Sequence, residues 1–422
     1  MRGNKVNCVV SCPIDIYAGY GGRSRDLVKE LIRTQPDWDI SILPQRWGDC
    51  RPGYLSDHRE FELMTRIIGS LQSKPDVWIQ ITVPNEFQPV GEFNIGITAA
   101  METTLSPLEW LKGCNRMDLV ITSSTHGKNS LVDSKWIINS TKETVEVQKP
   151  VEVLFEGFDT NTFKGLGREF KTNILEGLKT SWNYLCVGHW LPGVFGEDRK
   201  NIGYTIKMFL ETFKDMENAP GLILKTSKAV SSIIDREEIL RNIRDIQRTV
   251  QYNRTLPEIY LLHGDLKDSE MNEVYNDSRV KAMVLFTKGE GFGRPLLEFS
   301  AVGKPIICSA WSGMVDFLKP EHTAFVGGTL DKVHPSAANG MILQEASWFR
   351  PNDSDVKGAL QGIYQHYGRW LEKAEEQAEI LKNTKTMKDM GERLRDILNI
   401  YVPKFPERVE LNLPGIKPFV KN

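Results

Sequence analysis

Short apolar runs alternate with helix-like segments along most of this sequence, and each run is bounded by glycine or polar residues. Such alternation is typical of parallel sheets covered by helices on both faces, because strands buried on both sides read as continuous apolar runs. The chain is therefore of the α/β class, and helical periodicity predicts its first helix over 23–33. The strands expected in the first half are 6–11, 77–82, 95–98, 119–122 and 151–155.

The same rhythm restarts after residue 180, with expected strands at 184–188, 222–226, 259–263, 280–287 and 305–309. This restart predicts two doubly wound, Rossmann-like domains, and 422 residues suit two or three domains of about 150 residues each. The polar stretch 159–181 lacks a strand pattern and is the expected connection. We predict an amino-terminal domain over 1–170, a carboxyl-terminal domain over 171–385, and a helical segment over 386–422 that packs back across the domains.

The composition is that of an ordinary globular protein, with 40% hydrophobic and 26% charged residues. It excludes disorder, collagen and small disulfide scaffolds. We expect neither a membrane span nor a signal peptide, and six cysteines without a C-x-x-C pair predict reduced thiols in a cytoplasmic protein. The formal net charge of −2 gives no overall attraction to nucleic acid, so a polyanionic partner would need a local patch.

A glycine-rich loop carries the strongest chemical signal. Glycine alternates with other residues over 289–293, after an apolar run and before a short helix, so the backbone can approach a phosphate closely. Glu290 and Glu298 place two carboxylates beside this loop, and carboxylates accept charge-assisted hydrogen bonds from sugar or ribose hydroxyls. The alternative is that Glu298 only pairs with Arg294 on a solvated helix face.

The segment KGEGFGRPLLEFSAVGKPII resembles the Glu-(seven residues)-Glu segment of retaining GT-B glycosyltransferases of family 4, which have two Rossmann-like domains facing across a cleft. VGHWLPGVFGEDRKNIGYTIKMFLETF resembles that family's arginine- and lysine-containing segment, and YAGYGGRSRDLVKEL resembles its glycine-rich first turn. The resemblance spans nearly the whole chain, and the carboxyl half is similar to bacteriophage-encoded members. It implies a GT-B fold and transfer of a sugar from a UDP- or GDP-sugar to a hydroxyl acceptor, with no cofactor besides that donor.

The resemblance also implies roles for single residues around the donor. Glu298 would hold the ribose hydroxyls, and Glu290 would hold the transferred sugar together with backbone N–H groups. Lys200 takes the family's lysine position beside the diphosphate, assisted by Arg199. The N–H groups that would hold the sugar belong to Gly291, Phe292 and Gly293.

His189 departs from the family pattern, because it stands where the family has an arginine. It is either a diphosphate contact or an ordinary polar strand end. Arg294 or Lys225 is expected to supply the missing cation. Gly21 and Gly22, in the first strand-to-helix turn, would approach the same diphosphate from the opposite domain, or simply form a tight turn.

Glu102 follows the expected strand 95–98, at the sheet edge where α/β proteins bind ligands. It is expected to contact the sugar or the acceptor, or else to be a carboxylate at the start of a helix. His126 is interpreted as a surface histidine.

Sugar transfer builds negative charge on the leaving diphosphate, which Lys200, Arg294 and Lys225 would stabilise without a metal. The sequence has no D-x-D motif in a plausible loop, no H-E-x-x-H and no His/Cys cluster, so we predict no metal site. The resemblance implies attack from the face of departure, with the leaving phosphate taking the acceptor's proton.

The acceptor is expected at the amino-terminal domain, where Arg46, Trp47 and Arg51 lie in a segment that mixes arginine with aromatics. This mixture suits phosphate and base contacts, a sugar platform, or a mixed-charge surface loop without a ligand. The similarity to phage members favours a 5-hydroxymethylated pyrimidine in phage DNA, in the host cytoplasm. A saccharide or lipid acceptor is the alternative.

Other functions are known to occur on Rossmann-like folds. A catalytically inactive module that only binds nucleotide sugars is consistent with His189 at the arginine position. The segment 290–298 argues against a nucleotide-sugar epimerase, and the first strand is not followed by the G-x-G-x-x-G fingerprint of a nicotinamide dehydrogenase. The sequence determines neither the donor base and sugar nor the oligomeric state.

Overall fold

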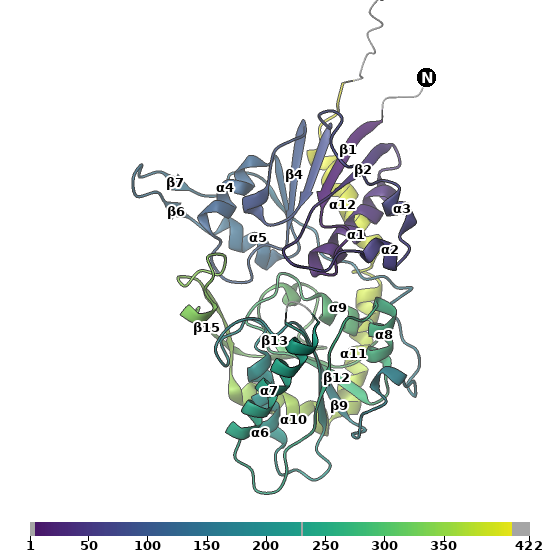
Figure 1. Cartoon of the computed structure of the whole chain (residues 1–422), viewed down its shortest axis with the longest axis vertical. Coiled ribbons are helices and arrows are strands. Elements are labelled where there is room, and N and C mark those ends of the chain that lie inside the picture. The colour runs from purple at the N-terminus through teal and green to yellow at the C-terminus, as the bar shows by residue number, and fades with distance from the viewer. Residues whose placement is uncertain (1–4, 229–230, 407–422) are drawn as a thin grey trace, which may run out of the picture.

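Two parallel sheets form the framework of the protein, one in each of two α/β domains (Figure 1). The computed structural model describes residues 5–228 and 231–406. The amino-terminal sheet has the strand order β2-β1-β3-β4-β5-β8, and every neighbouring pair is parallel. Its strands are β1 Val6–Cys12, β2 Trp38–Pro44, β3 Val77–Ile81, β4 Phe93–Thr98, β5 Leu119–Thr122 and β8 Val151–Val153.

Helices cover both faces of this sheet because its strands are apolar on both sides. Cys8 and Val10 pack with one group of helices, whereas Val9 between them packs with Trp110 on the other face. A short antiparallel pair, β6 Trp136–Ile137 and β7 Thr144–Val145, projects from this domain. The helices are α1 Gly19–Thr34, α2 Tyr54–Asp57, α3 Phe61–Met64, η1 Pro84–Glu86, α4 Leu108–Arg116 and α5 Thr125–Val132.

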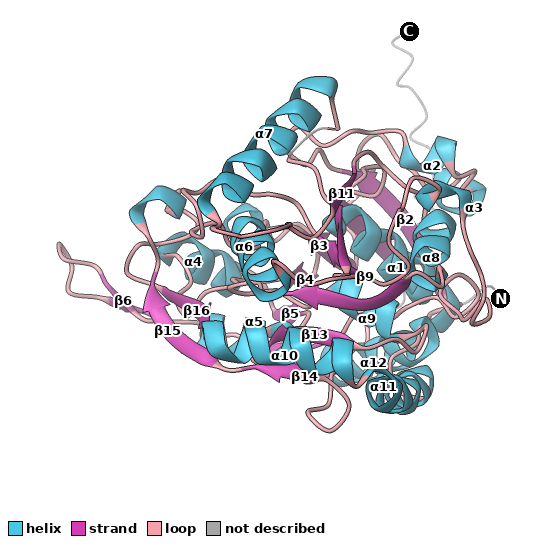
Figure 2. Cartoon of the chain, turned by 90° about the horizontal axis from the view of Figure 1, so that it is seen from below, coloured by secondary structure: helices cyan, strands magenta, loops and turns pink. Residues whose placement is uncertain are grey.

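The carboxyl-terminal sheet repeats this plan with the order β11-β10-β9-β12-β13-β14, again all parallel. Its strands are β9 Asn183–Val187, β10 Gly221–Lys225, β11 Ile259–Leu262, β12 Val280–Leu285, β13 Ile306–Ser309 and β14 Ala324–Val326. Helices lie around it (Figure 2): η2 Asn173–Leu175, α6 Ile202–Phe213, α7 Ile233–Thr249, α8 Asp268–Asn276, α9 Arg294–Ser300, η3 Gly313–Asp316, α10 Asp353–Gln365 and α11 Tyr367–Lys382.

An antiparallel hairpin of β15 Gly328–Lys332 and β16 Ser347–Pro351 is inserted between β14 and α10, with η4 Pro335–Ala337 in its loop. It reaches the amino-terminal domain, because Thr104 and Ser347 exchange two hydrogen bonds across the domain boundary. Leu105 of the amino-terminal domain joins Trp348 in a small apolar cluster beside these bonds. The hairpin therefore holds the two domains together at one side of their interface.

Helix α12, Met387–Tyr401, returns the chain to the amino-terminal domain. The chain crosses where Phe158 exchanges two backbone hydrogen bonds, with Lys385 and with Met387. Gly157 is required there, since a Cβ would lie 2.6 Å from the carbonyl oxygen of Thr386. Met390, Leu394, Ile397 and Leu398 then pack into the core of β1 and α1.

The predicted fold class is confirmed, and all ten predicted strands are present to within two residues at either end. The edge strands β2 and β14 and the β15–β16 hairpin were not predicted. β2 is an edge strand in which exposed and buried residues alternate, and it carries Asp39 and Pro44 in place of a continuous apolar run, whereas β14 has only three residues. All six cysteines are free, and Cys8, Cys186 and Cys308 lie buried in strands as expected.

The first helix begins at Gly19 and not at Arg23. Its start was missed because Ala18, at the cap position, offers no side-chain hydrogen bond to the first turn. Gly21 and Gly22 consequently lie in the first turn of α1, not in the turn before it. The predicted segment 386–422 contains α12, and its residues 407–422 lie outside the described residues.

Helix α12 supplies a test of this packing. Leu394→Ala should lower the free energy of unfolding by roughly 3 kcal/mol, because it removes a buried side chain from the hydrophobic core that α12 shares with β1 and α1. Ile400→Ala, on the same helix but 70% exposed, should change it by less than about 0.5 kcal/mol. Urea unfolding followed by tryptophan fluorescence measures both, and equal losses in the two variants would show that α12 is not part of the core.

Candidate functional site

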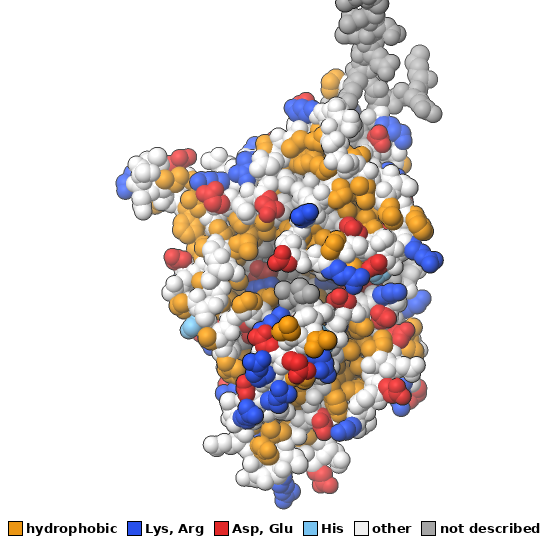
Figure 3. Space-filling view, in the orientation of Figure 1, with side chains coloured by type: hydrophobic (Ala, Val, Ile, Leu, Met, Phe, Trp, Pro, Cys, Tyr) orange, Lys and Arg blue, Asp and Glu red, His pale blue; other side chains and the backbone are white. Residues whose placement is uncertain are grey.

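Loops at the carboxyl ends of strands from both sheets border one cleft of about 1030 Å³. The amino-terminal domain contributes the start of α1 after β1 and the segment after β4. The carboxyl-terminal domain contributes the segment between β9 and α6 and the glycine-rich loop between β12 and α9. Figure 3 shows acidic and basic side chains meeting along the hollow between the domains.

Glu290 lines this cleft, and two cations from the segment before α6 lie beside its carboxylate. Both of its carboxylate oxygens accept hydrogen bonds of 2.7 Å from Lys200 Nζ. Arg199 Nη1 lies 3.8 Å from the same carboxylate. Three residues expected around the donor, Glu290, Lys200 and Arg199, therefore lie together in the structure, and their direct ion pairing was not predicted.

Burial alone would raise the pKa of Glu290, but Lys200 and Arg199 outweigh it and hold this pKa below its usual value. The carboxylate is consequently ionised at neutral pH. Its position is fixed by its own backbone, since Glu290 N donates a 2.9 Å hydrogen bond to Ser312 Oγ. Gly289 allows the loop to approach the other domain, because a Cβ would lie 2.0 Å from the carbonyl oxygen of Glu102.

Glu102 joins this cluster from the amino-terminal domain. Its Oε1 lies 3.1 Å from Arg199 Nη2, so Arg199 bridges two carboxylates from different domains. Helix α4 begins only at Leu108, which excludes the alternative of a carboxylate at a helix start. The structure thus brings together Glu102, Arg199, Lys200 and Glu290, two carboxylates and two cations.

A second charge cluster surrounds Arg294 at another part of the cleft. Arg294 Nε donates a 2.8 Å hydrogen bond to Glu298 Oε1, and Nη1 pairs with Asp26 of α1 across the domain boundary. Glu156, also from the amino-terminal half, lies 3.9 Å away. Arg294 is therefore held by three carboxylates, so that binding a diphosphate would require it to leave them. The i, i+4 pair with Glu298 exists, but in the cleft and not on a solvated face.

The pKa of Glu298 lies above the usual range of a glutamate. Burial raises its pKa to about 7, although Arg294 opposes this shift and Asp268 adds to it. A group with this pKa changes its charge near neutral pH. Gly293, at the cap of α9, has φ of +99°, a left-handed conformation that suits glycine.

The two remaining predicted donor contacts of this domain, His189 and Lys225, line the cleft. Burial and the nearby Lys200 lower the pKa of His189, so its ring is neutral at neutral pH and does not replace the charge of an arginine. Its Nδ1 lies 3.2 Å from Ser227 Oγ. Lys225 Nζ donates a 2.7 Å hydrogen bond to the carbonyl oxygen of Gly264, and burial lowers its pKa.

Gly22 lines the cleft, and a Cβ there would lie 3.5 Å from Arg294 Nη1. Gly21 has a packing role, since a Cβ would lie 2.3 Å from the carbonyl oxygen of Ile16. The loop residues Gly291, Phe292 and Gly293 line the cleft as predicted.

An aromatic arm extends the cleft along the amino-terminal domain; its members are Tyr17, Tyr20, Trp47, Tyr54 and His58. Trp47 stacks on Tyr20 with 4.1 Å between ring centroids. Tyr54 stacks on His58 at 3.9 Å. Such faces suit ring-shaped ligands.

The two arginines predicted with Trp47 lie outside the cleft lining. Arg46 is exposed. Arg51 is also exposed, and its Nη2 donates a 2.8 Å hydrogen bond to Asp57. Of these three acceptor candidates, the structure places Trp47 in the cleft.

Four further residues line the cleft and were not predicted from the sequence: Asp26, Glu156, Tyr17 and Tyr20. Asp26 lies one helical turn after Gly22, so helical periodicity is a signal that indicates it. The others depend on tertiary contacts. His126, interpreted as a surface histidine, is half-buried with its ring 4.5 Å from Trp311, and burial lowers its pKa to about 4.

Within residues 5–228 and 231–406, no group of three or more His, Cys, Asp or Glu side chains is arranged to hold a metal ion. Over the same residues, none of the helices combines the length and the apolar surface needed to cross a bilayer.

Residues 251–332 match the family described as "Glycosyl transferases group 1", and this match includes Glu290, Arg294 and Glu298. Among curated proteins, none matches the chain significantly. Solved structures share the fold at low sequence identity. HepE from Anabaena in complex with UDP and glucose has a TM-score of 0.60 and 11% identity, covering 94% of this chain and 100% of that one.

Two further structures are similar over the same extent. Sucrose-phosphate synthase from Thermosynechococcus elongatus has a TM-score of 0.59 and 12% identity, covering 94% of this chain and 99% of its own. A UDP-forming alpha,alpha-trehalose-phosphate synthase from Burkholderia xenovorans has a TM-score of 0.59 and 9% identity, covering 95% and 100%. The chain therefore has the two-domain GT-B fold, and its segment 251–332 carries the match to group 1 glycosyltransferases.

Proposed function

We propose that this protein is a retaining glycosyltransferase that moves a sugar from a nucleotide diphosphate sugar to a hydroxyl acceptor. The observation that carries this proposal is the cluster of Glu290, Lys200 and Arg199 in the interdomain cleft of a GT-B fold, with Glu290 inside the segment that matches group 1 glycosyltransferases. The cluster offers cations for a diphosphate and a carboxylate for sugar hydroxyls.

The proposed donor is a UDP- or GDP-sugar, and UDP-glucose is the first to test because HepE was solved in complex with it. Glu298 would accept hydrogen bonds from the ribose, and Glu290 with its following N–H groups would hold the sugar. Lys200 and Arg199 would turn from Glu290 to the diphosphate. Arg199, already 3.8 Å from Glu290, supplies the guanidinium that neutral His189 does not.

In the proposed reaction, charge compensation comes from Lys200 and Arg199 in place of a metal ion. Negative charge grows on the leaving diphosphate as the sugar–phosphate bond breaks, and Lys200 and Arg199, once turned to the diphosphate, stabilise this charge. The leaving phosphate would take the proton of the acceptor hydroxyl, which attacks on the same face. Glu102, at 3.1 Å from Arg199, would face the sugar or the acceptor from the other domain.

The acceptor would lie along the aromatic arm, whose faces stack on a nucleobase or on a sugar ring. A 5-hydroxymethylated pyrimidine in phage DNA is the proposed acceptor, supported by the resemblance to phage-encoded members. Charge adds little support, since Arg51 pairs with Asp57 and Lys29 with Glu60 beside this arm. A saccharide or lipid hydroxyl is therefore the alternative outcome of the acceptor test.

Removal of Lys200 tests the proposed donor site. Lys200→Met should lower kcat/KM for transfer from UDP-glucose roughly 100-fold, because it removes a cation from the developing charge. Glu290→Gln should also lower it strongly. The matched control is Lys207→Met, which removes a lysine of α6 outside the cleft and should leave the rate unchanged.

The assay incubates the protein with UDP- and GDP-sugars and with hydroxymethylated DNA, plain DNA or oligosaccharides, and follows nucleoside and sugar masses. A mass increase confined to hydroxymethylated DNA supports the proposed acceptor. A mass increase on an oligosaccharide would instead support the alternative, a saccharide acceptor. Donor binding without transfer or hydrolysis on any acceptor would favour an inactive binding module and contradict the proposal.

Glu298 predicts a pH dependence of donor affinity. With a pKa of about 7, its carboxylate is ionised above pH 8 and becomes protonated as the pH falls through 7. Affinity for UDP-glucose should therefore be highest above pH 8 and fall by about tenfold near pH 6. Calorimetric titration between pH 6 and 8.5 measures it. Glu298→Gln should bind more weakly without this slope, and a slope that survives in Glu298→Gln would assign it to another group.

A further inference from the structure

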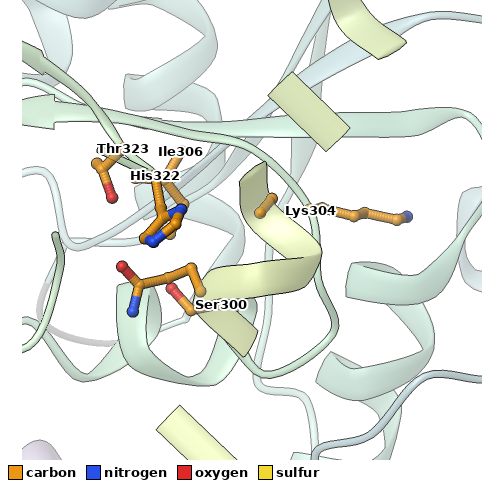
Figure 4. A pocket seen from close by; sticks show the side chains of 7 residues that line it. Ser300, Lys304, Ile306, His322 and Thr323 are labelled. Atoms are coloured by element: carbon orange, nitrogen blue, oxygen red, sulfur yellow. The ribbon is translucent and has the colours of Figure 1, made fainter. Parts of the chain in front are cut away.

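Two lysines outside the proposed chemistry lie in the interior of the carboxyl-terminal domain, Lys288 fully buried and Lys304 partly buried. Lys304 borders a cavity of about 10 Å³ with Ser300, Ile306 and His322, and its side chain runs away from His322 (Figure 4). Its Nζ donates hydrogen bonds of 2.7 to 2.8 Å to the carbonyl oxygens of Tyr275, Asp277 and Val280, between the last turn of α8 and the start of β12. These bonds account for Lys304 as a structural residue.

Lys288 is different because its partner is an ionised side chain beside the cleft. Lys288 lies two residues before Glu290 in the sequence, and its side chain is only 1% exposed. Its Nζ donates a 2.8 Å hydrogen bond to Glu197 Oε2 and lies 4.4 Å from the ring centroid of Trp348. Burying a cation costs desolvation free energy, which an oppositely charged partner with good hydrogen-bond geometry offsets.

Glu197 belongs to the segment that carries the two cleft cations, two residues before Arg199 and three before Lys200. The backbone of Lys288 holds the same segment, because Lys288 N donates a 2.8 Å hydrogen bond to the carbonyl oxygen of Arg199. Side chain and backbone of Lys288 therefore fix the segment at two points on either side of Asp198.

Lys288 also contacts the hairpin that reaches the other domain. Phe349 N of β16 donates a 3.0 Å hydrogen bond to the carbonyl oxygen of Lys288, and Trp348 of the same strand is fully buried. The next residue toward the start of β16, Ser347, exchanges two hydrogen bonds with Thr104, close in the chain to Glu102. Lys288 thus connects the segment that carries Arg199 and Lys200 with the β15–β16 hairpin, which in turn contacts Thr104 near Glu102.

We propose that Lys288 is a positioning residue for sugar transfer, which holds Arg199 and Lys200 toward Glu290 through Glu197 and the β16 strand. This inference rests on the proposed function. Lys288 has no contact with the reacting atoms in this account. Its loss should act on the placement of the two cations and on the rate, and only weakly on donor binding, to which Glu298 and Lys225 contribute independently.

Lys288→Met tests this, because methionine keeps an unbranched apolar side chain beneath Trp348 but removes the charge. We expect kcat to fall at least tenfold with the donor KM changed less than threefold. Lys304→Met is the matched control for losing an interior lysine: it should lower the thermal midpoint but leave kcat unchanged. Loss of kcat in both variants to the same degree, or kcat of Lys288→Met within twofold of the wild type, would overturn the inference.

Glu197 also pairs with Arg350 Nη2 at 3.0 Å, so Lys288→Met leaves this carboxylate with one of its two cationic partners. The double variant Lys288→Met/Glu197→Gln separates positioning from the cost of losing the buried partner. It should recover part of the thermal midpoint, since no carboxylate then lacks that partner, while kcat stays low. Recovery of kcat together with the midpoint would show a merely structural role and would overturn the inference.

Amide hydrogen exchange tests the placement without any turnover. In Lys288→Met, residues 188–201 and the β15–β16 hairpin should exchange at least tenfold faster than in the wild type, while β11 and α8 stay unchanged. Unchanged exchange over 188–201 would overturn the inference. If exchange rises as expected but the wild type transfers no sugar from any donor, the proposed function fails and the positioning of these residues by Lys288 stands.

Discussion

The ion pair between Lys200 and Glu290 lies where the carboxyl edges of the two parallel sheets face each other. Strand order and handedness of βα units place the loops after β1, β4, β9 and β12 at these edges, so residues far apart in sequence meet in one cleft. Two cations, Arg199 and Lys200, there face two carboxylates, the buried Glu290 and the partly exposed Glu102, so their formal charges cancel. The cleft thereby keeps ionised groups ready in the absence of ligand, and an anionic ligand can replace Glu290 as their partner.

Ion pairs also join the domains across this cleft. Arg199 pairs with Glu102, and Arg294 pairs with Asp26, each bridging from the carboxyl-terminal to the amino-terminal domain. The hairpin and α12 add apolar contacts at other parts of the interface. A ligand that competes for Arg199 or Arg294 therefore competes with contacts between the domains.

The sequence predicted most of the fold because buried central strands are apolar on both faces, whatever their neighbours. The prediction from sequence missed β2 and the β15–β16 hairpin, where one face is exposed and the local pattern is mixed. It failed at the start of α1 because Ala18 gives no capping signal. In each case the missing information lies in tertiary contacts, not in local periodicity.

The site was predicted unevenly for the same reason. Glu290, Lys200 and Glu298 follow from the resemblance to the family's motifs, and all line the cleft. The i, i+4 pair of Arg294 with Glu298 was weighed from local spacing, whereas its pairing with Asp26 and the bridging position of Arg199 depend on how the two domains face each other, which no local pattern reports. Trp47 was found among neighbours that point elsewhere, since short-range composition does not tell which side of a loop faces a cleft.

The position of a bound nucleotide tests the central claim most directly. Diffraction from crystals grown with UDP should show the diphosphate within hydrogen-bond distance of Lys200 Nζ and Arg199, and the ribose hydroxyls at Glu298. Lys200 should then no longer give both of its 2.7 Å contacts to Glu290. A nucleotide bound outside the interdomain cleft, or a diphosphate held by other residues while the Lys200–Glu290 pair stays intact, would contradict the account.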